Sequence, residues 1–224
     1  MGDKLIWIFI FIIGLCIGSF LNVLAYRIPQ KMKPNGRSMC PHCNHELKWY
    51  ELIPVFSYIL LKGKCKNCNE RISILYPIIE IMTALFYSLL YLTFGFGYEF
   101  FLYVFVITIM IIIIRIDYEH KYIPDRLNLS LLIAGVVHIV YLSINKIESI
   151  FPNIIGFVVG FLLCYIIRLI GSLVYKKEAM GFGDVKLLAV IGLLLGYKGA
   201  IFTFFIGCII ATLIELTLMK LKVK

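Results

Sequence analysis

Long apolar runs, separated by short polar segments, extend along nearly the whole chain. A helix needs about 20 apolar residues to cross the hydrocarbon core of a bilayer. The pattern therefore predicts an all-α polytopic membrane protein with about seven transmembrane helices, and six to eight as the range. The apolar runs lie at residues 5–26, 74–94, 98–116, 127–144, 151–174, 185–196 and 200–219.

The run at 185–196 is shorter than the others. It predicts either a half-helix or a segment that tilts and merges with the run at 200–219 near Gly196–Gly199. The boundary between the second and third runs depends on the stretch FGFGYE, whose glycines indicate a turn.

Composition agrees with a membrane protein. Hydrophobic residues make up 61% of the chain and the mean hydropathy is +0.94, whereas soluble domains contain about 45–50% apolar residues. The first run has the apolar character of a secretory signal peptide, but it lacks a small-x-small cleavage site and further apolar runs follow it. We therefore expect it to be retained as the first transmembrane helix.

The distribution of positive charge predicts the orientation of the chain, whose net charge is +9. Alternate polar segments, at 27–71, 115–126, 168–186 and 220–224, hold 19 of the 22 lysines and arginines. Cytosolic loops carry such an excess, so we expect these segments in the cytosol and the N-terminus outside. No basic stripe interleaved with aromatic residues indicates nucleic-acid binding.

Pairs of glycines four residues apart recur in the apolar runs. Such pairs let helices approach closely in membranes, so they predict tight helix packing. The pairs are Gly14/Gly18, Gly156/Gly160 and Gly192/Gly196.

The segment 27–71 is the one sizeable polar insertion, and it carries two C-x-x-C pairs. Cys40, Cys43, Cys65 and Cys68 follow the spacing C-x2-C-x21-C-x2-C. Four thiolates can enclose a tetrahedral zinc ion and leave no open position, which indicates a structural metal in a zinc knuckle. The alternatives are disulfides, redox chemistry and ordinary packing. A reducing cytosol argues against disulfides.

Between the two cysteine pairs, the stretch LKWYELIPVFSYILLKGK is too short, and too interrupted by Pro54, to cross a membrane. Trp49, Tyr50, Phe56 and Tyr58 suit a segment that lies at the membrane interface. They suit equally the small core of a zinc knuckle, and both alternatives stay open at this point.

Acidic residues in or beside apolar runs are functional candidates, because a charge in the bilayer is costly. Asp117 ends the third run, Asp184 begins the sixth, and Glu80 lies in the second. The predicted orientation brings Asp117 and Asp184 to the same cytosolic leaflet. Two carboxylates placed close together cannot both ionise cheaply, so one acts as a general base on water while the protonated one donates to a carbonyl oxygen.

Asp184 belongs to the stretch GFGD, in which Gly181 and Gly183 permit backbone conformations and close approaches that other residues do not. The competing interpretation is that Asp184 only caps the helix that follows. A proton- or ion-coupled transporter would also use Asp117 and Asp184 as a relay. We would expect an internal repeat in a transporter, and the sequence shows none.

Several stretches together resemble the type IV prepilin peptidases, bilobal membrane aspartic proteases that share the G-x-G-D element of presenilin-like proteases. The resemblance covers nearly the whole chain and includes both cysteine pairs. The other stretches are GSFLNVLAYRIP at 18–29, WYELIPVFSYILLKGKC at 49–65, YPIIE at 76–80, DYEHKYIPDRLN at 117–128 and GFGDVKLLA at 181–189.

This resemblance implies that Asp117 and Asp184 form a catalytic dyad, with Gly181, Gly183 and Lys186 supporting the catalytic loop. It implies that the four cysteines belong to an N-terminal domain that holds the first span, the cysteine loop and the second span. The implied domains are 1–94 for this N-terminal part and 95–224 for the catalytic membrane aspartic protease.

The resemblance also implies the reaction. A basic leader peptide is removed from a prepilin or pseudopilin, after a glycine, at the cytosolic face of the bacterial cytoplasmic membrane. The new N-terminal amine is then methylated with S-adenosylmethionine. Glu80 lies where the family places this second activity, and the alternative for Glu80 is a buried acid paired with a lysine or arginine of a neighbouring span.

The expected cofactors are structural zinc and S-adenosylmethionine, and the expected partners are prepilin substrates and the lipid bilayer. A competing function is a non-catalytic assembly factor that docks through its zinc loop.

Overall fold

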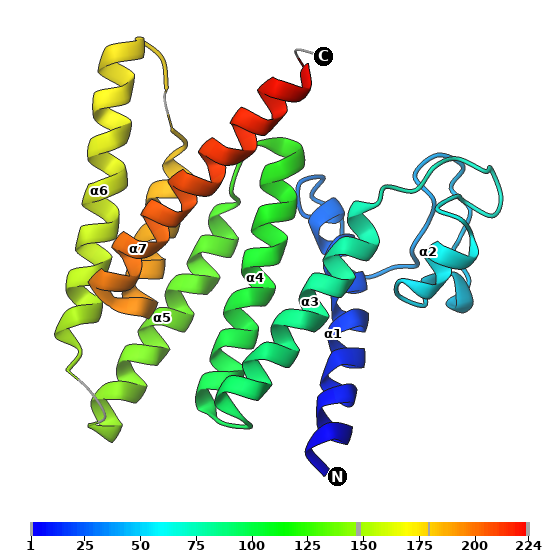
Figure 1. Cartoon of the computed structure of the whole chain (residues 1–224), viewed down its shortest axis with the longest axis horizontal. Coiled ribbons are helices and arrows are strands. Elements are labelled where there is room, and N and C mark those ends of the chain that lie inside the picture. The colour runs from blue at the N-terminus through cyan, green and yellow to red at the C-terminus, as the bar shows by residue number, and fades with distance from the viewer. Residues whose placement is uncertain (1, 147–148, 179, 223–224) are drawn as a thin grey trace. The chain divides into compact units, whose positions relative to one another are not determined.

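The computed structural model describes residues 2–146, 149–178 and 180–222. These residues form helices joined by connections, without a β-strand in the described ranges, as Figure 1 shows. The last two residues of the predicted cytosolic segment 220–224 lie outside them. The helices are α1 (Gly2–Arg27), the 3-10 helix η1 (Trp49–Leu52), α2 (Phe56–Leu60), α3 (Leu75–Phe94), α4 (Tyr98–His120), α5 (Asp125–Asn145), α6 (Phe151–Tyr175) and α7 (Phe182–Lys222).

Six of these helices, α1 and α3 to α7, are long and apolar enough to cross a membrane. The prediction of an all-α, multi-pass membrane protein is therefore confirmed. The turn predicted from FGFGYE is present, because α3 ends at Phe94 and α4 begins at Tyr98. The apolar helices number six rather than seven because the runs predicted at 185–196 and 200–219 form one element, α7.

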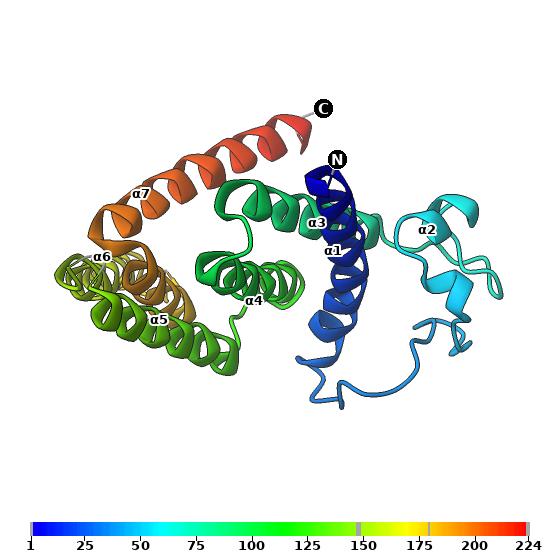
Figure 2. The same cartoon turned by 90° about the horizontal axis from the view of Figure 1, so that it is seen from below.

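Helix α7 is broken at Gly196, whose backbone angles of φ 73° and ψ 176° are not helical. A residue with a side chain is strained at this φ. The chain changes direction here and α7 has two arms, which Figure 2 shows diverging from the break. The arm that begins at Phe182 is about 21 Å long at 1.5 Å per residue, shorter than the hydrocarbon core of about 30 Å. The short helix predicted at 185–196 is thus present as the first arm, and Gly196 joins it to the helix that follows.

A buried amide supports this break. Asn153 of α6 is 8% exposed, and its Nδ2 donates to the carbonyl oxygen of Leu193 at 2.9 Å. Carbonyls before a break lose their partners in the helix, so Asn153 replaces a hydrogen bond that α7 cannot make itself.

Contacts divide the chain into two compact units, Met1–Lys121 and Tyr122–Lys224. In the first unit α1, α3 and α4 pack on one another. Figure 1 shows these helices alternating in direction, so the end of α1, the start of α3 and the end of α4 lie at one end of the unit. The cysteine loop leaves from this end, since it joins α1 to α3.

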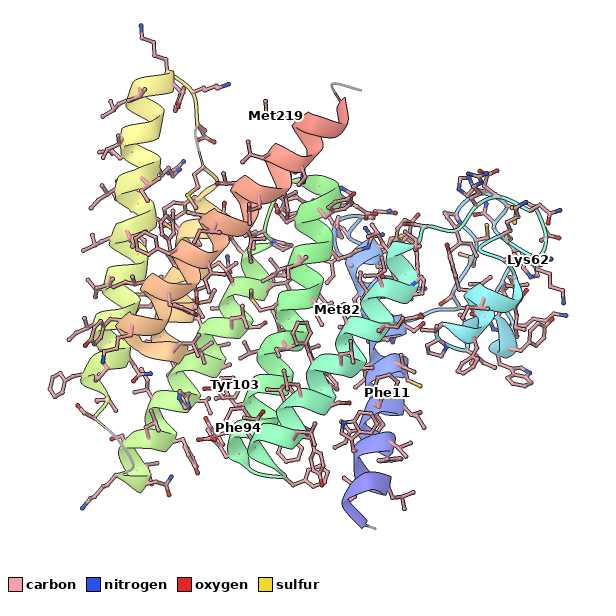
Figure 3. The ribbon with its side chains drawn as sticks, in the orientation of Figure 1. Phe11, Lys62, Met82, Phe94, Tyr103 and Met219 are labelled. Carbon is pink, nitrogen blue, oxygen red and sulfur yellow. The ribbon has the colours of Figure 1, made fainter. Side chains whose placement is uncertain are left out.

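Glycines allow α1 to approach α3. A Cβ atom at Gly14 would lie 2.5 Å from Cα of Ala84, and one at Gly18 would lie 2.7 Å from Cα of Glu80. Towards the other end of the unit, Phe94 of α3 stacks on Tyr103 of α4 with ring centroids 5.2 Å apart, as Figure 3 shows. The backbones of α1 and α3 are therefore in close contact, whereas aromatic rings pack between α3 and α4.

In the second unit α5 and α6 each pack against α7. The two remaining glycine pairs face each other: a Cβ atom at Gly156 would collide with the carbonyl oxygen of Gly192, and one at Gly160 would lie 2.5 Å from that of Leu188. The tight packing predicted from the three glycine pairs is confirmed.

Candidate functional site

The GFGD turn opens α7 in the second unit, and both of its glycines leave room for a neighbour. A Cβ atom at Gly181 would lie 3.1 Å from Oδ2 of Asp184, and one at Gly183 would lie 2.9 Å from Cβ of Ile123. Gly181 therefore lets the carboxylate of Asp184 come close, and Gly183 lets Ile123, in the segment before α5, come close.

Asp184 is half-buried in the first turn of α7. The helix begins at Phe182, so Asp184 lies inside the helix rather than at the N-cap position. A carboxylate in the first turn is still stabilised by the free N–H groups and the positive end of the helix dipole.

The start of α5 is tied to this turn by two polar contacts. Asn128, 4% exposed, donates from Nδ2 to the carbonyl oxygen of Gly183 at 3.2 Å. Nζ of Lys186 lies 2.7 Å from Oδ1 of Asp125. These contacts fix the backbone of the turn against α5, and they give Lys186 a partner that the sequence did not indicate.

Arg168 of α6 organises the other side of the turn. Its Nε donates to the carbonyl oxygen of Met180 at 3.0 Å, and its Cζ lies 5.3 Å from the ring centroid of Phe182. Nζ of Lys186 lies 5.1 Å from the same centroid. Sequence reasoning did not find this role, because one partner of Arg168 is a backbone carbonyl that no residue pattern reveals. The other partner is the exposed carboxylate of Glu178, whose Oε1 lies 3.2 Å from Nη2 of Arg168.

Asp117 lies in the last turn of α4, in the first unit, and is half-buried. Its carbonyl oxygen accepts from the N–H of Lys121 at 2.9 Å, and Lys121 ends the helix in the left-handed conformation. Arg115 is 8% exposed. Its Nη1 lies 2.5 Å from Oε1 of Glu119, and its Cζ lies 5.9 Å from the ring of Tyr76. These contacts fix the end of α4 against the start of α3.

The four cysteines of the loop come together as predicted. Each Sγ atom lies within 4.8 Å of the others, and the distances Cys40–Cys68 and Cys43–Cys65 are both 3.9 Å. Four sulfurs around a tetrahedral zinc, at about 2.3 Å from the metal, are about 3.8 Å apart. The cluster therefore has the dimensions of a metal site, and its sulfurs are too far apart for disulfides.

The two C-x-x-C pairs are built as equivalent turns. In the first, the N–H of Asn44 donates to the carbonyl of Cys40 at 2.9 Å, and in the second Asn69 donates to Cys65 at the same distance. Both asparagines have positive φ, 55° and 58°. Asparagine tolerates this conformation better than most residues. The repeated sequence C-x-x-C-N was a signal for these two residues that the sequence reasoning missed.

Hydrogen bonds prepare two of the thiols to ionise. The Asn67 side chain and the N–H of His45 lower the pKa of Cys43 to about 6, and backbone N–H groups lower the pKa of Cys65. A backbone hydrogen bond at Glu70 also favours the Cys68 thiolate, but desolvation and the neighbouring sulfurs outweigh it and raise the pKa of Cys68 to about 12. A bound metal would favour the charged form of these thiols, because thiol ligands bind metals as thiolates.

The cysteine loop is anchored to the membrane helices at two points. Arg27, the last residue of α1, is 8% exposed and donates to the carbonyls of Pro34, Gly36 and Arg37 at 2.5, 3.2 and 3.1 Å.

The second anchor is Glu80 of α3, which is 6% exposed. Its Oε2 accepts from the N–H of Val55 at 2.7 Å. The pairing of Glu80 with a lysine or arginine, an alternative for this residue, does not occur among the described residues. Glu80 instead fixes a residue of positive φ, Val55 at 62°, immediately before α2.

The aromatic segment of the loop leaves its largest side chains outside the zinc knuckle. Trp49 is 77% exposed, Leu60 78% and Phe56 63%. Figure 3 shows Lys62, which follows α2 in the chain, in the cysteine loop. This exposure argues against a knuckle core made of Trp49 and Phe56, and favours the alternative of a segment at the membrane interface.

The chain is similar to two protein families and to several known proteins. The model of the bacterial peptidase A24 N-terminal domain matches residues 12–94, and the model of the type IV leader peptidase family matches residues 104–216. No solved structure matches the chain.

Three relatives carry the name prepilin leader peptidase/N-methyltransferase. The protein of Myxococcus xanthus is 32% identical over 85% of this chain and 56% of its own length, so this chain spans little more than half of that relative. The protein of Vibrio cholerae is 30% identical over 89% of this chain and 81% of its own length. The protein of Dichelobacter nodosus is 32% identical over 81% of this chain and 72% of its own length. With the GFGD turn, the buried acids and the cysteine cluster in place, these matches show that the chain belongs to the type IV leader peptidase family.

Proposed function

We propose that this protein is a membrane-embedded aspartic endopeptidase that removes the basic leader peptide from type IV prepilins or pseudopilins. The observation that carries the proposal is the match of residues 104–216 to the type IV leader peptidase family. The names of the relatives support the same substrate class. A transporter and a non-catalytic assembly factor are not favoured, because neither agrees with this family.

Asp117 and Asp184 are the catalytic dyad. Ile123 contacts Gly183, the neighbour of Asp184, and Asp117 precedes Ile123 by only six residues. Six residues span at most about 22 Å, and the first of them are the last turn of α4. The segment that follows Asp117 therefore runs to the GFGD turn, and the dyad itself rests on the match to the type IV leader peptidase family.

The chemistry follows from two carboxyl groups that share one proton. The ionised one accepts a proton from water, whose oxygen bonds to the carbon of the scissile carbonyl, while the protonated one donates to the carbonyl oxygen. The tetrahedral intermediate then collapses as the leaving nitrogen accepts a proton and the C–N bond breaks. One carboxylic acid and one amine result.

Three residues support this site without taking part in the cleavage reaction: Gly181, Gly183 and Lys186. The two glycines admit the carboxylate and Ile123 at short distance. Lys186 reaches Asp125 and so helps to hold the start of α7 to the start of α5. The protease domain in this proposal is 95–224, and the domain at 1–94 carries the loop of four cysteines.

The charged and apolar parts of a prepilin agree with a site at the cytosolic face of the cytoplasmic membrane. A leader rich in lysine and arginine remains in the cytosol, and an apolar pilin stalk lies in the bilayer. The bond between them is then at the interface, where α4 ends and α7 begins in the predicted orientation.

The cysteine loop holds one structural zinc ion in this proposal. Its sulfur distances suit the ion, and its turns supply N–H groups that favour thiolates. Four thiolates leave the metal no open position, so Cys40, Cys43, Cys65 and Cys68 stabilise the fold of the loop and do not activate water.

A second activity, methylation of the new N-terminal amine, is supported by the name N-methyltransferase that the relatives carry. S-Adenosylmethionine supplies the methyl group when it is bound.

Cleavage by the purified protein tests the dyad. We expect wild type to shorten a prepilin by its leader, as measured by mass spectrometry, and Asp117→Asn and Asp184→Asn each to lose at least 1,000-fold in rate, about 4 kcal/mol in activation free energy. Glu99→Gln, an exposed acid at the opposite end of α4 from Asp117, is the control and should cleave normally. Cleavage near the wild-type rate by either aspartate variant would show that the dyad is wrongly assigned.

A further inference from the structure

The part of the cysteine loop that contains η1 and α2, residues 48–62, exposes an unusual amount of apolar surface. Trp49, Phe56, Ile59 and Leu60 are between 63% and 78% exposed. Single exposed apolar side chains are normal, whereas several in one short segment mark a surface that a partner covers. We call residues 48–62 the interfacial segment.

Glu80 fixes the depth of the interfacial segment relative to α3. Its Oε2 accepts from the N–H of Val55 at 2.7 Å, and Val55 immediately precedes α2. Because α3 begins at Leu75, Glu80 lies about 7.5 Å along this helix at 1.5 Å per residue. Figure 1 agrees, since α2 is level with the first part of α3 rather than beyond its end.

This depth is that of the bilayer surface. The helix α3 has the length and composition to cross a membrane, so a segment held beside its first turns lies where headgroups meet acyl chains. Interfacial helices bury their apolar side about 5–10 Å into this boundary. The surface that exposes Trp49 and Leu60 is therefore continuous with the lipid-facing surface of the membrane helices.

Lysines lie at both ends of the apolar stretch. Lys48 precedes η1, and Lys62 follows α2 after one residue. Nζ of Lys66 lies 3.2 Å from Oη of Tyr50, which brings a third lysine to η1. All three lysines are exposed, and none of them forms an ion pair among the described residues. Lysines in such positions extend their ammonium groups to the headgroups.

The acids of the cysteine loop do not neutralise these lysines. Residues 27–71 contain nine lysines and arginines but three acids, Glu46, Glu51 and Glu70. Glu51 is buried, and Glu46 pairs with Arg37. The loop therefore keeps an excess of positive charge beside its apolar side chains. Each basic residue near an anionic membrane surface favours the bound state by a factor of about five.

We propose that the interfacial segment binds the surface of a bilayer that contains anionic lipids. The apolar side chains of η1 and α2 enter the boundary with the acyl chains, and Lys48 and Lys62 contact the negatively charged headgroups. Lipid thus gives the cysteine loop a third attachment besides Arg27 and Glu80. The inference does not depend on the proposed peptidase activity, because it uses only the loop and the helices that carry it.

Trp49 provides a direct probe of this contact. The chain has two tryptophans, and Trp7→Phe leaves Trp49 as the only one while an aromatic ring still faces Phe11. Zinc-loaded Trp7→Phe is placed in vesicles that contain a fixed share of phosphatidylcholine brominated on its acyl chains. Bromine quenches tryptophan fluorescence only at short range, so quenching reports contact of Trp49 with the acyl boundary.

The remaining lipid is either anionic phosphatidylglycerol or neutral phosphatidylcholine. We expect Trp49 to be quenched about twofold more strongly with phosphatidylglycerol, since the lysines then favour the bound state. Salt at about 1 M should remove the difference, because it screens charges at a surface.

Two sets of variants in the Trp7→Phe background separate the charged from the apolar contribution. Lys48→Gln with Lys62→Gln should lower the quenching in phosphatidylglycerol to the value in phosphatidylcholine. Leu60→Ser should reduce quenching at least twofold in both lipids, because it removes an apolar side chain that is 78% exposed.

The matched control is Lys176→Gln with Lys177→Gln, which removes two exposed lysines from the segment after α6. It should keep the full preference for phosphatidylglycerol. Zinc content and the thermal unfolding temperature in detergent should equal those of wild type for every variant, since the replaced side chains are exposed.

Three results would overturn the inference. Equal quenching in the two lipids, or equal quenching of the Lys48→Gln, Lys62→Gln variant and its control, would show that the lysines do not select anionic headgroups. An absence of quenching in both lipids would place Trp49 in water. Protection of Trp49 that disappears on dilution of the protein in lipid would show that a second copy of the chain covers the segment.

Discussion

Gly183 shows how a single missing side chain shapes the proposed active site. Its position against Ile123 leaves less room than a methyl group needs, and its carbonyl is held by Asn128. The residue thus connects the start of α7 to the segment that follows Asp117 in the chain. Arg168 makes a comparable connection to Met180 from the side of α6.

Replacing Gly183 by alanine should impair cleavage. The added Cβ atom would lie 2.9 Å from Cβ of Ile123, and overpacking of this kind costs about 1–3 kcal/mol. Because the strain falls beside Asp184, we expect the rate of prepilin cleavage to fall at least tenfold.

The matched control is Gly207→Ala, which adds the same methyl group to α7 at a position with open space around it. It should cleave within twofold of wild type. Equal rates for Gly183→Ala and Gly207→Ala would mean that the approach of Ile123 does not matter to the site.

At the scale of elements, the cysteine loop depends on two small turns and two anchors. The turns place Cys40, Cys43, Cys65 and Cys68 around one centre. Arg27 and Glu80 fasten the loop to α1 and α3. Between the turns the exposed residues of η1 and α2 are apolar, which suits contact with lipid headgroups and the acyl boundary.

Zinc should be bound at one ion per chain by elemental analysis. Cys40→Ser removes one of the two most buried ligands and should lower the zinc content below about one fifth of an ion, because an incomplete shell binds the metal weakly. The control is Cys208→Ser, an exposed cysteine of α7 outside the cluster. A wild-type content far below one ion per chain would contradict a structural zinc site.

The sequence predicted the helices closely where apolar runs end at turn residues. The run at 74–94 corresponds to Leu75–Phe94, and the run at 98–116 corresponds to Tyr98–His120 with one further turn. It also predicted the cysteine cluster, since ligand spacing is a local property. It did not predict the roles of Arg27 and Arg168, because both donate to backbone carbonyls whose positions depend on the folded loops.

For the whole molecule, the number of membrane crossings follows from α7 rather than from the count of apolar helices. Six helices have the length and composition to cross. Figure 1 shows that the second arm of α7 returns towards the end of its unit where α5 begins and α6 ends. If α7 begins and ends at one face, only the five apolar helices before it carry the chain from one face to the other. Five crossings leave the two termini of the chain on opposite faces.

Reporter fusions measure this topology. Green fluorescent protein folds in the cytosol and alkaline phosphatase is active only outside it, so each should be active at one terminus alone. We expect a fluorescent C-terminal fusion and an active N-terminal phosphatase fusion, in agreement with the excess of lysine and arginine in the segments assigned to the cytosol. Both termini reporting the same side would overturn the proposed orientation.

The packing of α5 and α6 on α7 has a consequence for biosynthesis. Both earlier helices find their main partner in the last helix of the chain, and Gly156 and Gly160 stay without their neighbours until Gly192 and Leu188 arrive. During translation α5 and α6 are therefore synthesised before α7, the helix against which both pack. A polypeptide truncated before α7 would lack Asp184 and the neighbours of Gly156 and Gly160, so we expect it to insert its earlier helices without forming a peptidase site.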